Sequence, residues 1–196
     1  MIEHLSKIIM SKNVSRAENQ QERLITTGWI LGFVDGEGCF SINFVRQSDR
    51  KEKDRIRKGY KTGFQIFYEF AVTQGKSSLK SLEKIKDFFG IGNIYLNKRY
   101  DNHKEHLYRY TVRKREDLVD IIIPFFKKYE LRTSKKKNFE IFAKCLDEIS
   151  KGNHLTRNGA IRIAQMTEKM NHRKSRSKVI RILRNQTSDS AKAQRR

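Results

Sequence analysis

The sequence predicts an α+β protein whose main domain has the element order α-β-β-α-β-β-α, with one antiparallel sheet and the helices on one face of it. Two segments, 39–45 and 64–73, alternate apolar and polar residues as half-buried strands do. A second pair, 94–98 and 107–113, brackets an Asp-Asn turn and predicts a hairpin. Because an antiparallel sheet can leave one face in water, this fold offers a polar surface for binding.

Apolar residues at helical spacing surround these strands. The first helix, over 23–34, is apolar on several sides, which predicts burial in this chain or against a partner. The charged stretch 46–61 is expected to be a long mobile hairpin connection. Glycines 90 and 92 end the next helix. The helices expected after the first cover residues 79–89, 117–129, 138–150, 161–170 and 178–184.

Composition divides the chain into three parts. Residues 1–22 are polar and are expected to form a flexible N-terminal leader without the long apolar region of a signal peptide. Residues 23–170 form the main domain. Residues 171–196 contain nine basic residues and one acidic residue, and they predict a basic C-terminal helix and tail.

The charge balance points to a polyanionic partner. Lys and Arg number 43 against 22 Asp and Glu, so the net charge is +21. Nucleic acid is the leading partner for a domain this basic, and a ribosomal or chaperone-like basic protein is the alternative. Cys39 and Cys145 are far apart in no metal-ligand spacing, which favours a reducing, intracellular location. No apolar run is long enough to cross a membrane.

The exposed face of the predicted sheet carries polar and cationic side chains that suit the base edges of a DNA major groove. A merely solvated face is the alternative, and the net charge favours DNA. On this face the residues expected to contact DNA are Ser41, Asn43, Gln47, Gln65, Glu69, Asn97, Arg109, Thr111 and Arg113. In the basic tail, Lys174 and Arg176 are expected to contact phosphates.

The most specific motif is W-I-L-G-F-V-D-G-E-G over residues 29–38. It resembles the signature of the LAGLIDADG homing endonucleases, in which a helix runs into an acidic turn of the form L-x-G-F-x-D-G-[DE]-G. The resemblance extends over about residues 23–150 and implies the LAGLIDADG fold with a saddle-shaped sheet. It also implies that Glu37 is a catalytic metal ligand, with the Gly36 carbonyl as a second oxygen. Such hard oxygen ligands favour Mg²⁺. Mn²⁺ is expected to replace it, and Ca²⁺ to support binding only.

The motif occurs once in this chain, and single-motif members of the family act as homodimers. Gly28 and Gly32 are four residues apart on one helix face, which lets another backbone approach closely. These two glycines and Asp35 are therefore expected at the dimer interface, with capping of the turn as the alternative role for Asp35. Two-fold symmetry then implies a near-palindromic DNA target.

Two more catalytic residues are expected from the family pattern. Gln74 follows the second strand, where similar proteins place a polar residue that positions water or the metal shell; an ordinary strand-end glutamine is the alternative. Lys135 lies where the family keeps a catalytic lysine, and a cation there would stabilise charge on the cleaved phosphate. Lys136 and Lys137 remain alternatives to it, as does a solvated helix start.

Together these features predict a homing endonuclease that makes a Mg²⁺-dependent double-strand break in a long pseudo-palindromic DNA site and so promotes intron mobility. The alternatives are an intron-encoded RNA maturase, for which intron RNA is a further partner, and a DNA-binding regulator that does not cleave. The expected location is a chloroplast, a mitochondrion or a bacterial cytoplasm.

Overall fold

A four-stranded antiparallel sheet with the strand order β1-β4-β6-β5 organises the chain in the computed structural model, which describes residues 2–47, 49–100, 105–170 and 175–193. The strands are β1 (Gly38–Arg46), β4 (Phe64–Gly75), β5 (Asn93–Asn97) and β6 (Leu107–Val112). The expected order of helices and strands is confirmed, and so is the α+β class.

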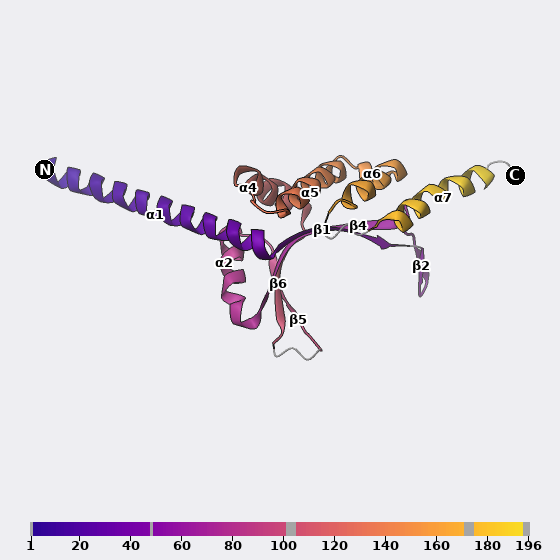
Figure 1. The fold of residues 1–196 in the computed structure, drawn as a ribbon, viewed down its shortest axis with the longest axis horizontal. Helices are drawn as coiled ribbons and strands as arrows, with labels where there is room; N and C mark the ends of the chain where they lie inside the picture. The colour runs from indigo at the N-terminus through magenta and orange to yellow at the C-terminus, as the bar shows by residue number, and fades with distance from the viewer. Residues whose placement is uncertain (1, 48, 101–104, 171–174, 194–196) are drawn as a thin grey trace.

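Helices cover one face of this sheet, and their aromatic side chains form the core (Figure 1). The covering helices are α2 (Leu79–Phe89), α4 (Ile123–Lys128), α5 (Lys135–Ser150) and α6 (Arg157–Thr167). Phe40 of β1 is fully buried, and its ring centroid lies 5.1 Å from that of Phe70 and 5.4 Å from those of Phe126 and Phe142. These close ring contacts, each worth about 0.5–1.5 kcal/mol beyond area burial, hold β1 against the helices.

The first helix is much longer than predicted. α1 runs from Ile2 to Glu37, so the expected boundary at residue 23 does not interrupt it. Its N-terminal end extends away from the sheet, while its C-terminal end leads directly into β1 (Figure 1). Ile30 and Val34 bury that last part of the helix in the core.

Two further segments differ from the sequence expectation. The connection between β1 and β4 contains a small hairpin of β2 (Arg50–Glu52) and β3 (Arg55–Arg57), closed by a 2.8 Å hydrogen bond from the Gly59 amide to Asp49 Oδ1. The predicted helix 117–129 is a run of α3 (Arg115–Asp117), a π-helical stretch (Leu118–Ile122) and α4. Pro124 has no N–H and crowds the preceding turn, which accounts for the wider helical geometry before it.

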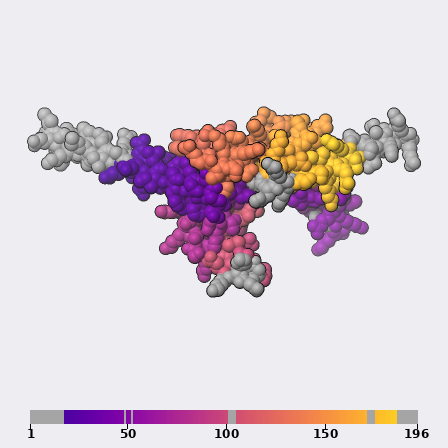
Figure 2. Space-filling model, in the orientation of Figure 1, coloured from indigo at the N-terminus to yellow at the C-terminus, as the bar shows by residue number. Residues whose placement is uncertain are grey.

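The C-terminal helix packs against the domain. α7 (Ser177–Ala193) lies beside α6 (Figure 2). Leu183 is fully buried with Phe64 of β4 and Ala160 of α6 in a second, smaller core. In the described residues no helix combines the length and apolarity needed to span a bilayer.

Candidate active site

The candidate site lies where α1 becomes β1. α1 ends at Glu37 and β1 begins at Gly38, without a loop between them. A Cβ at Gly38 would lie 2.7 Å from the Val34 carbonyl oxygen, so only glycine allows so tight a junction. The Glu37 side chain is left exposed at the end of the helix.

Asp35 fixes this junction to the segment that precedes α5. Its carboxylate accepts hydrogen bonds from the backbone amides of Arg132 (2.8 Å) and Thr133 (3.1 Å) and from Thr133 Oγ1 (2.6 Å). Burial opposes the charged form, but these bonds outweigh it and hold the pKa of Asp35 below its usual range. The Asp35 carboxylate is thus engaged within its own chain. Its expected place at the dimer interface stays a prediction.

Lys135 reaches the same junction from the start of α5. Its Nζ donates a 2.9 Å hydrogen bond to the Gly36 carbonyl, the oxygen expected to bind a metal ion. Burial lowers the pKa of Lys135, although the nearby Cys39 and the carboxylates of Asp35 and Glu37 oppose this shift. The Gly36 carbonyl oxygen is thus accessible to a positively charged group, and its expected role as a metal ligand stays a prediction.

The neighbouring lysines point elsewhere. Lys136 Nζ lies 2.8 Å from Glu130 Oε2 in an exposed ion pair, and Lys137 is exposed. Of the three lysines, it is therefore Lys135 whose contact is with the motif turn.

Gln74 lies at the same end of the sheet as Glu37. Gly38 pairs with Val72 in the β1–β4 register, so Gln74 is two residues past that pair and is half-buried beside Tyr108. The turn after it is held by Glu105, whose Oε2 accepts a 3.1 Å hydrogen bond from the Ser77 amide. No described contact joins Gln74 to Lys135, so its catalytic role stays a prediction.

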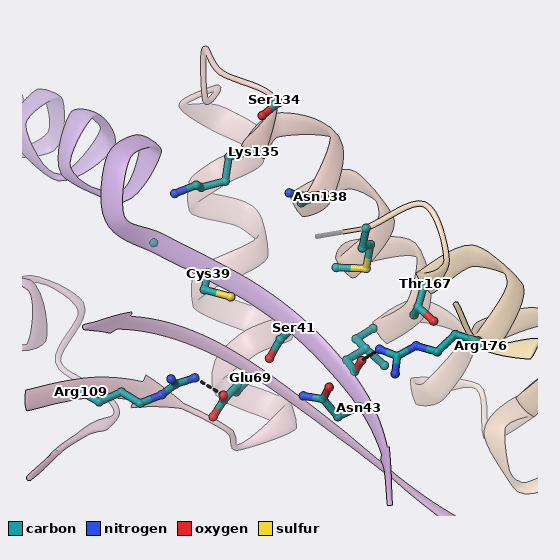
Figure 3. A pocket seen from close by; sticks show the side chains of 13 residues that line it. Cys39, Ser41, Asn43, Glu69, Arg109, Ser134, Lys135, Asn138, Thr167 and Arg176 are labelled. Atoms are coloured by element: carbon teal, nitrogen blue, oxygen red, sulfur yellow. Dashed lines mark hydrogen bonds and ion pairs between the residues drawn. The ribbon is translucent and has the colours of Figure 1, made fainter. Parts of the chain in front are cut away.

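A cavity extends from Lys135 along β1 to the polar face of the sheet (Figure 3). Lys135 and Asn138 line it from α5, and Ser41 and Asn43 line it from β1. The polar face therefore continues into the motif turn without interruption.

On that face, Glu69 of β4 holds two arginines of the neighbouring strand. Arg109 forms an ion pair with Glu69 Oε1, and Arg113 Nε lies 2.9 Å from Glu69 Oε2. Thr111, between these arginines, was expected to contact DNA but is only 3% exposed. Arg109 pairs with Thr73 in the register, so its side chain must run back over Thr111 to reach Glu69. This arrangement covers the threonine.

The remaining polar-face residues keep the predicted side. Gln47 Nε2 donates a 3.2 Å hydrogen bond to Gln65 Oε1, and Asn97 is exposed. Sequence reasoning missed Phe67 and Val45, which are 44% and 42% exposed on the same face. Their place in the strand alternation, in phase with Gln65 and Asn43, is a signal that could have found them.

The two tail residues have different outcomes. Lys174 lies outside the described residues. Arg176 is half-buried: its Nη2 donates a 2.9 Å hydrogen bond to the Ile42 carbonyl, and its guanidinium lies 5.7 Å from the centre of the Phe44 ring. It ties the start of α7 to the outer edge of β1, because an edge strand leaves carbonyls unpaired. The expected contact of Arg176 with phosphate stays a prediction.

The glycine face of α1 is open. A Cβ at Gly28 or at Gly32 would meet no atom within 4 Å. Leu24 and Ile25 beside them are 58% and 66% exposed. No group of three His, Cys, Asp or Glu side chains within the described ranges is arranged to hold a metal ion.

Comparison with known proteins decides the family. The family model for LAGLIDADG endonuclease matches residues 30–146, more than half of the chain. The chain belongs to the LAGLIDADG endonuclease family. The matched region of this LAGLIDADG chain includes Glu37, Gln74 and Lys135 and ends before α6.

Solved structures support the LAGLIDADG fold over a wider range. The homing endonuclease I-TnaI is 32% identical with a TM-score of 0.64, covering 81% of this chain and 96% of that one. I-LtrWI, a LAGLIDADG homing endonuclease bound to target DNA, is 30% identical with a TM-score of 0.66, covering 76% of this chain and 46% of that one.

Several of the curated relatives are longer proteins. The probable intron-encoded endonuclease Cox1-I1b of Schizosaccharomyces pombe is 32% identical over 118 residues, which cover 60% of this chain and 26% of that protein. This LAGLIDADG chain spans about a quarter of the length of such relatives.

Proposed function

We propose that this chain is a homing endonuclease that acts as a homodimer and makes a double-strand break in a long pseudo-palindromic DNA site. One observation carries the proposal: the exposed Glu37 carboxylate ends a helix whose Gly28 and Gly32 face is open, while Lys135 contacts the adjacent Gly36 carbonyl. Fungal relatives named as probable intron-encoded endonucleases support a role in intron mobility and, between the two expected locations, favour an organelle over a bacterial cytoplasm.

DNA binding rests on the polar face of the sheet and on charge. The face carries amide and guanidinium groups from all four strands of the sheet, and the chain has a net charge of +21. Guanidinium and amide side chains are those that pair bidentately with guanine and adenine in the major groove. Neighbours such as I-LtrWI, which is bound to target DNA, support duplex DNA as the ligand.

Dimerisation rests on the face of α1 that carries Gly28 and Gly32. Glycine inside a helix lowers helix stability by about 1 kcal/mol relative to alanine. Close approach of a second chain would explain why glycine occupies both positions. Two copies packed there would bring two Glu37 carboxylates and two Gly36 carbonyls together at one axis. Each strand of a symmetric target would then meet the same set of groups.

Substitution at Gly32 tests the dimer. Gly32→Leu has open space in the isolated chain, so the chain is expected to stay folded while sedimentation shows a monomer and cleavage is lost. Glu140→Leu, at an exposed position of α5, is the matched control and should remain dimeric. A Gly32→Leu protein that still forms the dimer and cleaves DNA would overturn this interface.

The chemistry is divided between a divalent cation and the chain. Glu37 and the Gly36 carbonyl offer hard oxygen ligands for Mg²⁺, with Mn²⁺ as a substitute. Bound Mg²⁺ supplies a more acidic water and neutralises charge on the leaving oxygen. The Lys135 ammonium stabilises the negative charge that grows on the phosphate. Gln74, at the same end of the sheet, orients water by hydrogen bonding.

Glu37→Gln tests the cleavage reaction. Duplexes that bind the full chain in Ca²⁺ are first recovered from a randomised library and then incubated with Mg²⁺. Glu37→Gln is expected to bind these duplexes in Ca²⁺ like the original chain and to leave both strands uncut. Glu130→Gln, which changes an exposed carboxylate paired with Lys136, is the control and should cleave.

The opposite outcomes separate the alternatives. A chain that binds selected duplexes but never cuts them in Mg²⁺ or Mn²⁺ is a DNA-binding regulator. Preferential binding of intron RNA over every duplex would favour an RNA maturase. Equal loss of binding and cleavage in Glu37→Gln would give Glu37 a structural role.

A further inference from the structure

Phe67 is an exposed aromatic residue on the polar sheet face, where β4 pairs with β1 beyond the end of its pairing with β6. It lies on β4 in phase with Gln65 and Glu69, and 44% of its side chain is exposed. Its sequence neighbours Ile66 and Tyr68 point to the opposite face and pack against the core. The Phe67 ring therefore lies among polar side chains, and packing in the core does not explain why an aromatic residue occupies this position.

Val45 is the second apolar side chain at this place. The β1–β4 register pairs Asn43 with Phe67 and Val45 with Gln65, so Val45 and Phe67 are diagonal neighbours on one face. Diagonal residues of this kind lie roughly 7–8 Å apart, within reach of an aromatic ring. Val45 is 42% exposed, so the two side chains present one small apolar surface to solvent.

The polar side chains around this apolar surface are engaged in bonds with one another. The Gln65 side chain accepts a hydrogen bond from Gln47, and Glu69 is occupied by Arg109 and Arg113. Phe67 and Val45 are apolar and cannot make such bonds. Because both are more than 40% exposed, a ligand that approaches this face meets their side chains directly.

Only one ordinary base offers an apolar group at the floor of the major groove: thymine, through its C5-methyl group. We infer that Phe67, with Val45 beside it, determines specificity by contacting a thymine methyl group in each half-site of the target. This inference rests on the proposed function, because it requires duplex DNA on the polar face.

The experiment uses the full chain and duplexes selected from a randomised library in Ca²⁺. Each thymine of a selected duplex is replaced in turn by deoxyuridine, which lacks only the methyl group. One thymine per half-site is expected to lose about fourfold in affinity, as the removal of one buried methyl group predicts. At that position Phe67→Ser should bind thymine and deoxyuridine equally, and Phe67→Leu should restore the preference.

Leu96→Ser is the matched control. Leu96 is also 44% exposed, but it lies on β5 out of phase with the polar-face residues Tyr95 and Asn97. It should keep the full deoxyuridine effect. Thermal unfolding of each variant shows that the exposed substitution leaves the fold intact.

Two results would overturn the inference: a deoxyuridine penalty that is the same in Phe67→Ser as in the original chain, or no thymine position that responds to loss of the methyl group. Both leave DNA binding intact and so leave the proposed function standing. If the library yields no preferred duplex at all, DNA recognition itself fails and this inference fails with it.

Discussion

Replacing Asp35 tests whether the motif turn is held by its own chain. Asp35→Ala removes the acceptor of three donors, the amides of Arg132 and Thr133 and the Thr133 hydroxyl. Hydrogen bonds to charged groups contribute about 1.5–3 kcal/mol each when buried, but this carboxylate is partly exposed and water competes for it. We therefore expect a total loss of about 2 kcal/mol, or roughly 4–8 °C in Tm for a chain of this size.

Thermal and urea unfolding at several protein concentrations measure this loss. Asp35→Asn keeps one acceptor oxygen and is expected to lose about half as much. A loss that is independent of concentration indicates a contact within one chain. If destabilisation instead vanishes at high protein concentration, Asp35 acts between subunits and the assignment made here is wrong.

The pH dependence gives a second check. The folded state lowers the pKa of Asp35, so its contribution is complete above the usual value of 3.8 and is lost as the pH falls through the lower, folded pKa. The stability difference between the original chain and Asp35→Ala should accordingly be constant near neutral pH and shrink below about pH 4. A difference that grows on acidification would contradict the hydrogen-bond geometry.

Three further predictions concern charged residues of the site and the sheet. Lys135→Ala is expected to slow cleavage by about 10²-fold or more, whereas Lys136→Ala should cleave normally; equal rates in a single-turnover assay would remove Lys135 from the site. Arg176→Ala should lower the Tm by roughly 2–6 °C with the salt dependence of DNA binding unchanged; a salt slope that falls by about one unit would show a phosphate contact instead. Glu69→Gln should reduce discrimination between bases by about 1–3 kcal/mol, measured by binding to single-base variants of a selected duplex. Tighter binding to every variant alike would mean that Glu69 merely offsets positive charge.

The sheet could be predicted from sequence because its two faces differ in polarity. The alternation in β1 and β4 sets which residues pack under the helices, and Phe40 and Phe70 are buried as expected. The motif turn was predictable for a related reason, since Gly38 and the acids around it follow a local pattern. The resemblance to the family, rather than local pattern, indicated that one of Lys135–Lys137 is a catalytic lysine.

Contacts between distant segments were not predictable in this way. The hydrogen bonds between Asp35 and Thr133 join residues nearly a hundred positions apart. No pattern in either segment predicts that the two come into contact. Thr111 has the right phase for a DNA contact but is covered by an arginine that leans back to Glu69. The sequence predicts that Arg176 belongs to a basic tail, but its side chain donates a hydrogen bond to the Ile42 carbonyl on the edge of β1.

In the proposed homodimer, the direct passage from α1 into β1 would couple DNA recognition mechanically to the assembly of the two chains. With no flexible residues between the helix and the strand, a shift of one α1 along its partner would carry the whole sheet with it. The packing of the two α1 helices at the two-fold axis would then determine how many base pairs separate the two half-sites. Enlarging a side chain at the α1 contact is accordingly expected to change the preferred spacer length in the DNA, even though that contact touches no base.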